Sequence, residues 1–183
     1  MEETGSALGS PLGRRALLTG AAGMAGALGL GFATALPAAA ARQTDWRWCN
    51  RCQCLFYAGN YTTGWCTQGG GHDYRDSYRY RCNYGSGSQG HSRWRWCNKC
   101  QSLFYGGTSS RGRCPAGGGH DWEGSYNYFI EYGNSDDDDE QEGWRWCNKC
   151  YCMCFSGNGN GRCPSGGRHN FRGSYHYYFS YQN

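Results

Sequence analysis

The chain has 183 residues and a formal net charge of +4, and it contains 13 cysteines, 31 glycines and 16% aromatic residues. It has no valine, and after residue 41 the large aliphatic side chains are reduced to a few positions such as Leu55, Leu103 and Ile130. This composition excludes a conventional aliphatic core, so the fold needs aromatic packing together with disulfides or bound metal. The aromatic and cysteine content also excludes a disordered chain.

Residues 1–41 are predicted to be an export signal. Arg14 and Arg15 precede a Gly/Ala/Leu run that reaches Leu36, and a string of four alanines ends at Ala41. A charged start, an apolar middle and a small-residue end are typical of a secretory signal, and the paired arginines resemble twin-arginine signals. The run is long enough for an uncleaved membrane anchor, but its glycines and alanines favour cleavage. We therefore expect a secreted protein of the cell wall or extracellular medium, folded before export and without a membrane span.

Three copies of one unit follow the signal. The residues WRWCNxC open each copy, a Gly-rich region occupies its middle, and Ser-Tyr-x-Tyr closes it. The copies begin 48 and 50 residues apart, which indicates a repeat architecture. The predicted repeats are residues 45–84, 93–133 and 143–183, separated by a Gly/Ser linker at 85–92 and an acidic linker at 134–142.

Three cysteines and one histidine recur at fixed positions in every repeat. The spacing is Cys-x2-Cys-x13-Cys-x5-His in the first two repeats, and the third repeat has one residue fewer before its last cysteine. Cys-x-x-Cys points two thiolates at one ion, and a later Cys and His complete a tetrahedron, as in structural zinc sites. We predict one structural Zn²⁺ per repeat, three per chain. The predicted metal ligands are Cys49, Cys52, Cys66 and His72, then Cys97, Cys100, Cys114 and His120, then Cys147, Cys150, Cys163 and His169.

A disulfide framework is the main alternative to metal, because exported cysteine-rich chains often use one. Three recurring cysteines per repeat cannot pair completely within one repeat, and disulfides give no role to a histidine at a fixed offset. Another metal such as iron is a further alternative, although a Cys3His set without an open position suits structural zinc better.

Four further cysteines do not recur in all repeats. Cys54 and Cys152 occupy one position, at which the second repeat has Ser102, and Cys154 replaces a phenylalanine and is expected to pack as one. A disulfide between Cys54 and Cys82 is one alternative. A soft-metal cluster of Cys152 and Cys154 with the Cys-x-x-Cys pair of the third repeat is another.

Short aromatic alternations and frequent glycines predict strands and turns rather than helices. We therefore expect an all-β fold of three short zinc-stapled repeats. The repeats are predicted to pack with pseudo-threefold, β-trefoil-like symmetry, because so few aliphatic residues favour shared burial of the aromatic rings. The alternative is a row of independent zinc-ribbon-like beads, which a mobile acidic linker would favour.

The sequence carries no catalytic signature. Two repeats place an aspartate directly after the predicted histidine ligand, but protein atoms already fill all four metal positions, whereas catalytic zinc keeps one for water. No Gly-x-Ser-x-Gly elbow and no phosphate-binding loop occurs. These features favour a non-enzymatic role.

Arginine and aromatic residues are candidates for a ligand surface. Six of the acidic residues lie in Asp136–Glu142, so the rest of the chain is strongly basic. Charge and stacking could hold an anionic polymer or a polysaccharide, whereas the alternative is that the rings pack inside and the arginines are merely solvated. The candidate ligand-binding residues, which recur between the paired tryptophans or after the histidine, are Arg47, Tyr74, Arg95, Trp122, Arg145 and Phe171.

The motifs W-x-W-C-x-x-C-x-x-L-F-Y and C-P-x-G-G-x-H resemble tandem cysteine-rich repeat modules of secreted actinobacterial and fungal proteins. The match runs from Trp46 to Tyr181 and is fullest at Cys114–His120, whereas Thr67 replaces the proline in the first repeat and Cys154 interrupts L-F-Y in the third. The resemblance implies secretion and a repeat architecture, and it implies no activity.

Export and repetition together predict a secreted, non-catalytic, multivalent binding protein. Its expected partner is cell-wall or environmental polysaccharide or another anionic cell-surface polymer, because weak sites on one chain gain avidity for a repeating polymer. Nucleic acid is not the favoured partner. A structural subunit that binds another secreted protein and a secreted hydrolase are the alternatives.

Overall fold

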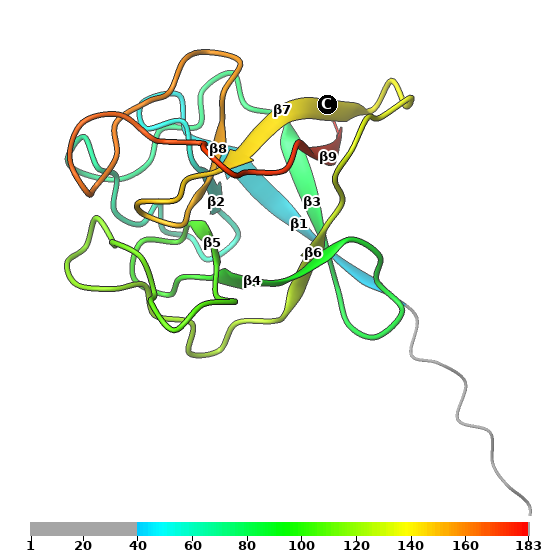
Figure 1. Cartoon of the computed structure of the whole chain (residues 1–183), viewed down its shortest axis with the longest axis horizontal. Coiled ribbons are helices and arrows are strands. Elements are labelled where there is room, and N and C mark those ends of the chain that lie inside the picture. The colour runs from blue at the N-terminus through cyan, green and yellow to red at the C-terminus, as the bar shows by residue number, and fades with distance from the viewer. Residues whose placement is uncertain (1–39, 183) are drawn as a thin grey trace, which may run out of the picture. The chain divides into compact units, whose positions relative to one another are not determined.

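The computed structural model describes residues 40–182, and all but the last two residues of the predicted signal peptide lie outside this range. The described residues form an all-β structure (Figure 1), which confirms the expected fold class. Within residues 40–182 there is no helix, and hence none that is long and apolar enough to cross a membrane.

Each repeat contributes three strands. In chain order they are β1 (Ala41–Trp48), β2 (Leu55–Tyr57), β3 (Arg79–Tyr84), β4 (His91–Trp96), β5 (Leu103–Tyr105), β6 (Tyr128–Ile130), β7 (Glu140–Trp146), β8 (Met153–Phe155) and β9 (Tyr177–Gln182). The last residues of both predicted linkers belong to strands, β4 after the first linker and β7 after the second.

The first two strands of each repeat form an antiparallel hairpin, and the Cys-x-x-Cys sequence lies in the turn between them. The register is the same in all three hairpins, since the first tryptophan of the opening motif always pairs with the last residue of L-F-Y or its equivalent. The pairs are Trp46 with Tyr57, Trp94 with Tyr105 and Trp144 with Phe155. A common register follows from the common pattern of inward and outward side chains.

The repeats share one sheet rather than forming separate beads. Strand β3 of the first repeat pairs with β6 of the second and with β9 of the third. The hairpins also bond to one another in a ring: Tyr57 N donates to Gln101 O at 2.9 Å, Tyr105 N to Tyr151 O at 2.9 Å, and Phe155 N to Gln53 O at 2.8 Å. Each repeat therefore bonds to the next, and the third bonds back to the first. The description as a β-trefoil stays a prediction.

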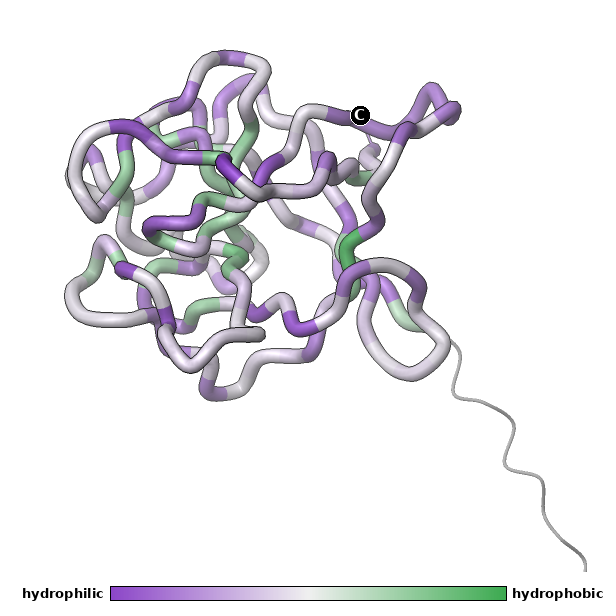
Figure 2. The backbone as a smooth tube through the Cα atoms, viewed as in Figure 1, coloured by the Kyte–Doolittle hydropathy of each residue, from purple (hydrophilic) through white to green (hydrophobic). Residues whose placement is uncertain are grey.

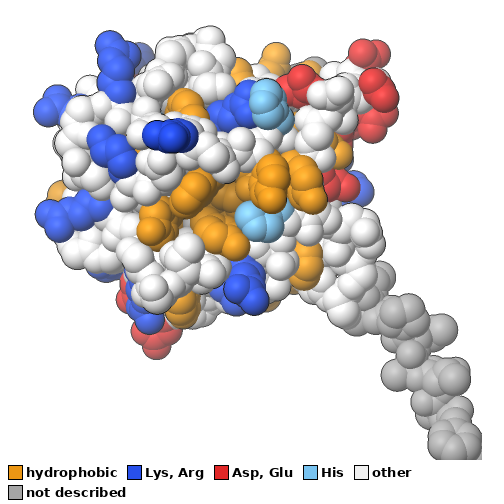
Figure 3. Space-filling view, in the orientation of Figure 1, with side chains coloured by type: hydrophobic (Ala, Val, Ile, Leu, Met, Phe, Trp, Pro, Cys, Tyr) orange, Lys and Arg blue, Asp and Glu red, His pale blue; other side chains and the backbone are white. Residues whose placement is uncertain are grey.

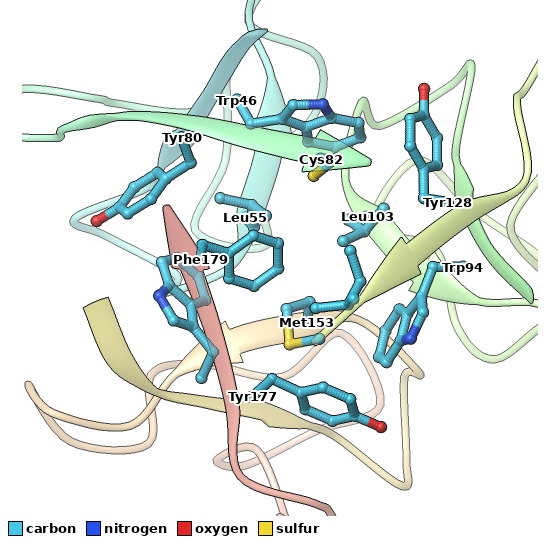
Figure 4. Close-up of a cluster of buried hydrophobic side chains, with 12 residues drawn as sticks. Trp46, Leu55, Tyr80, Cys82, Trp94, Leu103, Tyr128, Met153, Tyr177 and Phe179 are labelled. Carbon is cyan, nitrogen blue, oxygen red and sulfur yellow. The ribbon is translucent and has the colours of Figure 1, made fainter. Parts of the chain in front are cut away.

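The core contains four buried side chains from each repeat. Leu55, Leu103 and Met153 lie at its centre, and tryptophan and tyrosine rings surround them (Figure 4). In Figure 2 the hydrophobic residues concentrate in the interior, and the connecting loops are mostly hydrophilic. Aromatic rings thus supply the burial that the scarce aliphatic residues cannot. The twelve residues are Trp46, Leu55, Tyr80, Cys82, Trp94, Leu103, Tyr128, Ile130, Trp144, Met153, Tyr177 and Phe179.

The acidic linker is bonded to the end of β9. Tyr181 donates its backbone N–H to Asp139 O at 2.9 Å and its hydroxyl to Asp138 O at 3.1 Å. Ser135 N donates to the carboxylate of Glu142 at 2.7 Å. These bonds hold the linker backbone while the four aspartate side chains remain exposed.

Candidate metal centres

The Cys-x-x-Cys turn is built in the same way in every repeat. In the second repeat, Cys97 N donates to Ser102 O at 3.0 Å and Gln101 N donates to Cys97 O at 2.8 Å. Gln101 has a φ of 66°, and the equivalent Gln53 and Tyr151 have 68°. A left-handed residue directly after the second cysteine turns the chain back into the next strand, so both thiols point into the hairpin turn.

A glycine-rich loop brings the third cysteine and the histidine to the same place. Gly69 and Gly70 have φ values of 90° and 63°, which side-chain-bearing residues rarely adopt. Cys66 N donates to Gly70 O at 2.8 Å, so the loop doubles back on itself just before His72. The side chain of Arg51, from the Cys-x-x-Cys turn, holds this loop by donating to Gln68 O at 2.8 Å.

The structure brings the four predicted ligands of each repeat together in a buried cluster. The sulfurs of the first and third cysteines lie 3.9, 3.9 and 4.0 Å apart in the three repeats, and the second cysteine sulfur lies 3.4 Å from histidine Nδ1 in each. All donor atoms within a cluster are within 4.8 Å of one another. Donors of one tetrahedral zinc lie about 3.8 Å apart for two sulfurs and about 3.6 Å for sulfur and nitrogen. Three clusters that could hold metal ions are therefore present.

The sulfur–sulfur distances within the clusters argue against the disulfide alternative. The sulfur separations within the clusters are close to twice the length of a disulfide bond, about 2.05 Å. All 13 cysteines are free thiols in the structure. The donors are therefore spaced for an ion between them rather than for a covalent bond.

In each cluster, the surroundings of the first cysteine favour its thiolate form. Hydrogen bonds from the other two thiols of the cluster hold the pKa of Cys49, Cys97 and Cys147 far below its ordinary value. The backbone N–H that follows the histidine points at the same sulfur, as Asp73 N does toward Cys49 at 3.4 Å. N–H donors favour the charged form of a sulfur, and thiolate is the form that binds metal.

The histidines tie every cluster to the next repeat. With Nδ1 facing the cysteines, Nε2 donates to the carbonyl oxygen of the second cysteine in the neighbouring Cys-x-x-Cys turn. The bonds are His72 to Cys100 O at 3.1 Å, His120 to Cys150 O at 3.1 Å and His169 to Cys52 O at 3.2 Å. Such bonds fix the tautomer and the ring orientation of a metal-binding histidine. A metal ion bound in one repeat would thereby also order the contact with the neighbouring repeat.

Asp73 does not face the cluster with its carboxylate. The carboxylate binds the guanidinium of Arg75 at 2.6 Å, and these hydrogen bonds lower the pKa of Asp73. Asp121 accepts a bond from Glu123 N at 3.2 Å. The aspartates that follow the histidines thus contribute their backbone N–H to the cluster and direct their carboxylates elsewhere.

The four other cysteines lie in two places. Cys82 is in the main core, at the position that Ile130 and Phe179 take in the other repeats. Cys54, Cys152 and Cys154 lie together in a second buried cluster, in which Cys54 contacts both Cys152 and Cys154. Cys152 lies 3.4 Å from His120 Nε2, and Cys54 faces Cys154 with 2.8 Å between their sulfurs. The partner of Cys54 is therefore Cys154 rather than Cys82. Burial raises the pKa of the Cys54, Cys82 and Cys154 thiols.

The candidate ligand-binding residues lie at the surface or half-buried, and the repeats arrange them differently. The Arg47 guanidinium lies 5.7 Å from the centre of the Tyr74 ring. Arg95 and Trp122 line one hollow of about 440 Å³ together with Arg93, Gly106 and Ser125. Arg145 instead donates to His176 Nδ1 at 2.7 Å, while Phe171 is parallel to the ring of His169, with 6.3 Å between their centres.

Three exposed tyrosine pairs were not predicted from the sequence. The first tyrosine of each Ser-Tyr-x-Tyr motif stacks on a tyrosine of a neighbouring repeat: Tyr78 on Tyr181 at 4.1 Å, Tyr126 on Tyr84 at 4.1 Å and Tyr175 on Tyr132 at 4.7 Å. Tyr78, Tyr126 and Tyr175 are 39%, 48% and 53% exposed. The recurring motif was the one signal for them in the sequence, but it does not reveal the partner rings.

Comparisons with models of protein families, with curated protein sequences and with solved structures found no match to this chain.

Proposed function

We propose that this protein is a secreted, non-catalytic binding protein, stapled by one structural zinc ion per repeat, that binds polysaccharide through exposed aromatic rings. The observation that carries the proposal is the threefold recurrence of a stacked tyrosine pair with at least one exposed ring. A ring held in a stack loses little freedom when a second flat surface packs on it, and tyrosine offers both an apolar face and a hydroxyl. Three such rings on one body can bind a repeating polymer with avidity.

The hollow of the second repeat supports the same class of ligand. It is lined by Trp122, Arg93 and Arg95 and has a volume suited to a small polar ligand. The guanidinium of Arg111 lies over the Trp122 ring, 4.3 Å from its centre. In Figure 3, Lys and Arg side chains are visible around the hydrophobic side chains in the middle of the face, and acidic side chains lie mainly at the upper right, with others at the lower left. Aromatic and basic groups in this arrangement suit a neutral or anionic glycan.

Zinc is the metal that the clusters suit best. Each has three sulfurs and one imidazole nitrogen, all buried and at tetrahedral spacing. This is the donor set of structural zinc, and four protein donors leave no position for a catalytic water. The clusters therefore support a structural role for the metal, and catalysis finds no support in them.

The test is a co-sedimentation assay with insoluble cell wall, chitin and cellulose, and separately with DNA, at low and moderate salt. We expect glycan binding that survives salt, because stacking is not screened whereas phosphate contacts are. The triple variant Tyr78→Ala/Tyr126→Ala/Tyr175→Ala should lose this binding by at least tenfold. Trp65→Ala, which removes an exposed ring outside the tyrosine pairs, is the matched control and should bind as the wild type does.

Other outcomes separate the alternatives. Binding that disappears with salt would assign a polyanion as the partner, and release of soluble sugar would assign a hydrolase. If no glycan binds and the protein co-purifies with another secreted chain, the subunit interpretation replaces the proposal. The exposed aspartates of the acidic linker, which form no ion pair with any described residue, would then be the first surface to test.

A further inference from the structure

Three equivalent β-bridges connect the hairpins of neighbouring repeats, and in one of them both paired residues are cysteines. Short antiparallel bridges join the hairpins in a ring, and they pair Phe56 with Ser102, Phe104 with Cys152, and Cys54 with Cys154. In the first two bridges a phenylalanine faces a small side chain. In the third, cysteine replaces the phenylalanine and faces the cysteine of the first repeat, so two thiols of different repeats meet there.

The two sulfurs are closer than any non-bonded pair should be. They lie 2.8 Å apart, whereas heavy atoms in van der Waals contact are about 3.5–4.0 Å apart. Directly opposed residues of an antiparallel pair have Cα atoms about 4.5–5.5 Å apart, and this falls within the range of about 4.4–6.8 Å that disulfides span. Cys54 is 3% exposed and Cys154 is fully buried. The backbone is thus already placed for a bond, and solvent is excluded from the pair.

A metal ion fits the same place less well. His169 Nε2 lies 3.5 Å from Cys54 Sγ and would be the third donor. That nitrogen already donates its proton to Cys52 O at 3.2 Å, as the other two histidines do to their neighbours, so it has no free lone pair. Two sulfurs on one tetrahedral ion would also be about 3.8 Å apart, which is about 1 Å more than the observed separation of 2.8 Å.

We propose that Cys54 and Cys154 form a disulfide that links the first repeat to the third. The chain itself connects the first repeat to the second and the second to the third, so the contact between the third and the first is the one that lacks a covalent connection. The two cysteines are 100 residues apart in sequence. A bond between them closes the ring of repeats and constrains the unfolded chain over a long loop.

The oxidant is a low-molecular-weight disulfide. Because both thiols are buried, the reaction takes place when the contact between the two repeats opens locally. One of the two cysteine sulfurs then attacks the small disulfide as a thiolate, forms a mixed disulfide and releases one small thiol. The second sulfur then attacks the first, forms the S–S bond and releases the other small thiol. Two protein thiols are oxidised, one small disulfide is reduced to two thiols, and the two hydrogens pass from the protein to the small thiols.

The test starts from the purified metal-loaded protein, equilibrated either with glutathione disulfide or with a phosphine reductant. Each sample is denatured in an alkylating agent, digested and analysed by mass spectrometry without further reduction. In the oxidised sample we expect one cross-link, located by fragmentation at Cys54 and Cys154, with all other cysteines alkylated and the metal content unchanged. No cross-link, or a cross-link between other cysteines, would overturn the proposal.

Variants that take their side chains from the other repeats keep the test independent of folding. Cys54→Ser copies Ser102, and Cys154→Phe copies Phe56 and Phe104, so both side chains already fit their bridge in this fold. Oxidation should raise the melting temperature of the wild type by more than about 5 °C, and it should raise that of the control Cys152→Ser equally. Neither Cys54→Ser nor Cys154→Phe should respond. A further metal ion in the wild type that Cys54→Ser lacks would overturn the disulfide in favour of a soft-metal site.

Discussion

Cysteine occupies three kinds of surroundings at single positions of this chain. Cys100 faces His120 Nδ1 at 3.4 Å within a four-donor cluster. Cys82 is buried in the main core cluster, where it takes the place of Ile130. Cys154 meets a second thiol from another repeat. A cysteine can therefore be a ligand, a small apolar side chain or a cross-linking partner within one fold.

The first prediction compares two substitutions only two residues apart. Cys100→Ser removes a metal donor and should reduce the metal content by one ion per chain and the free energy of unfolding by more than about 4 kcal/mol, since losing a metal is among the largest single-residue effects. Ser102→Cys only gives the second repeat the residue found in the other two. It should keep the full metal content and melt within a few degrees of the wild type. Elemental analysis and thermal melts check both, and equal stability of the two variants would remove Cys100 from the metal site.

At the scale of the hairpin, the residue directly after Cys-x-x-Cys determines how the chain turns from the candidate metal cluster into the second strand. Gln101 has a left-handed φ of 66°. Its side chain accepts bonds from Trp96 Nε1 at 3.1 Å and Asn60 Nδ2 at 3.0 Å, and donates to Asn98 O at 2.9 Å. One buried amide thus joins its own hairpin to a loop of the first repeat.

The second prediction separates these bonds from the backbone conformation. Gln101→Gly keeps the left-handed φ but loses three hydrogen bonds, and should lower the free energy of unfolding by about 2–3 kcal/mol. Gln101→Val loses the same bonds and adds left-handed strain, so it should cost at least about 1 kcal/mol more. Urea unfolding measures both, with the exposed Gln89→Gly as a control that should stay within about 0.5 kcal/mol of the wild type. Equal costs for glycine and valine would show that φ is not a constraint here.

For the whole molecule, the ring of contacts connects the three candidate metal clusters, so metal binding at one would affect the others. Each histidine binds the carbonyl of the neighbouring Cys-x-x-Cys turn, and the third repeat binds back to the first. Loss of the ion from one repeat would therefore loosen the Cys-x-x-Cys turn of that repeat. The carbonyl of this turn orients the histidine of the preceding repeat, so the preceding cluster would be weakened as well. This is the physical basis for cooperative folding, because metal binding and folding are one equilibrium in sites of this kind.

The third prediction follows from this interdependence. Elemental analysis of protein purified without added metal should find close to three zinc ions per chain. A strong chelator should release all of them in a single transition that coincides with the loss of the near-ultraviolet circular dichroism signal. Release in three separate steps, with partial structure after each, would contradict the coupling between repeats. Absence of metal, with oxidised cysteines in the clusters, would establish the disulfide framework instead.

The fourth prediction concerns alkaline pH. Burial raises the pKa of Tyr80, Tyr128 and Tyr177, so the folded protein keeps these protons when the unfolded chain releases them near pH 10. A folded pKa above the unfolded pKa gives stability that is fully present below about pH 10 and is lost as pH rises, by up to about 1.4 kcal/mol per pH unit for each tyrosine. Urea unfolding between about pH 8 and 11.5 should show this loss. Buried thiols such as Cys82 contribute to the same slope, so Tyr80→Phe should remove only its own share, up to about 1.4 kcal/mol per pH unit. An unchanged slope would exclude Tyr80 as a source.

Local sequence patterns were enough to predict the twelve candidate metal donors and the all-β fold of this protein. The Cys-x-x-Cys turn, the glycines before the histidine and the alternating aromatic residues act over a few residues, so their outcome can be read locally. The three clusters are built from the twelve residues that the spacing predicted, and the described chain is all-β. The scarcity of aliphatic residues predicted packed repeats over beads, but no local pattern records which strands of one repeat pair with those of another.

Only the tertiary structure decided which residues of different repeats meet. Cys54 and Cys154 are 100 residues apart, and the partner of each stacked tyrosine likewise comes from another repeat. The histidine Nε2 bonds to neighbouring carbonyls depend on the same closure of the ring. Local sequence specifies each hairpin and its candidate metal donors because the contacts within them are short-range. The pairing of thiols and tyrosine rings between repeats depends instead on how three similar repeats are arranged around a shared core.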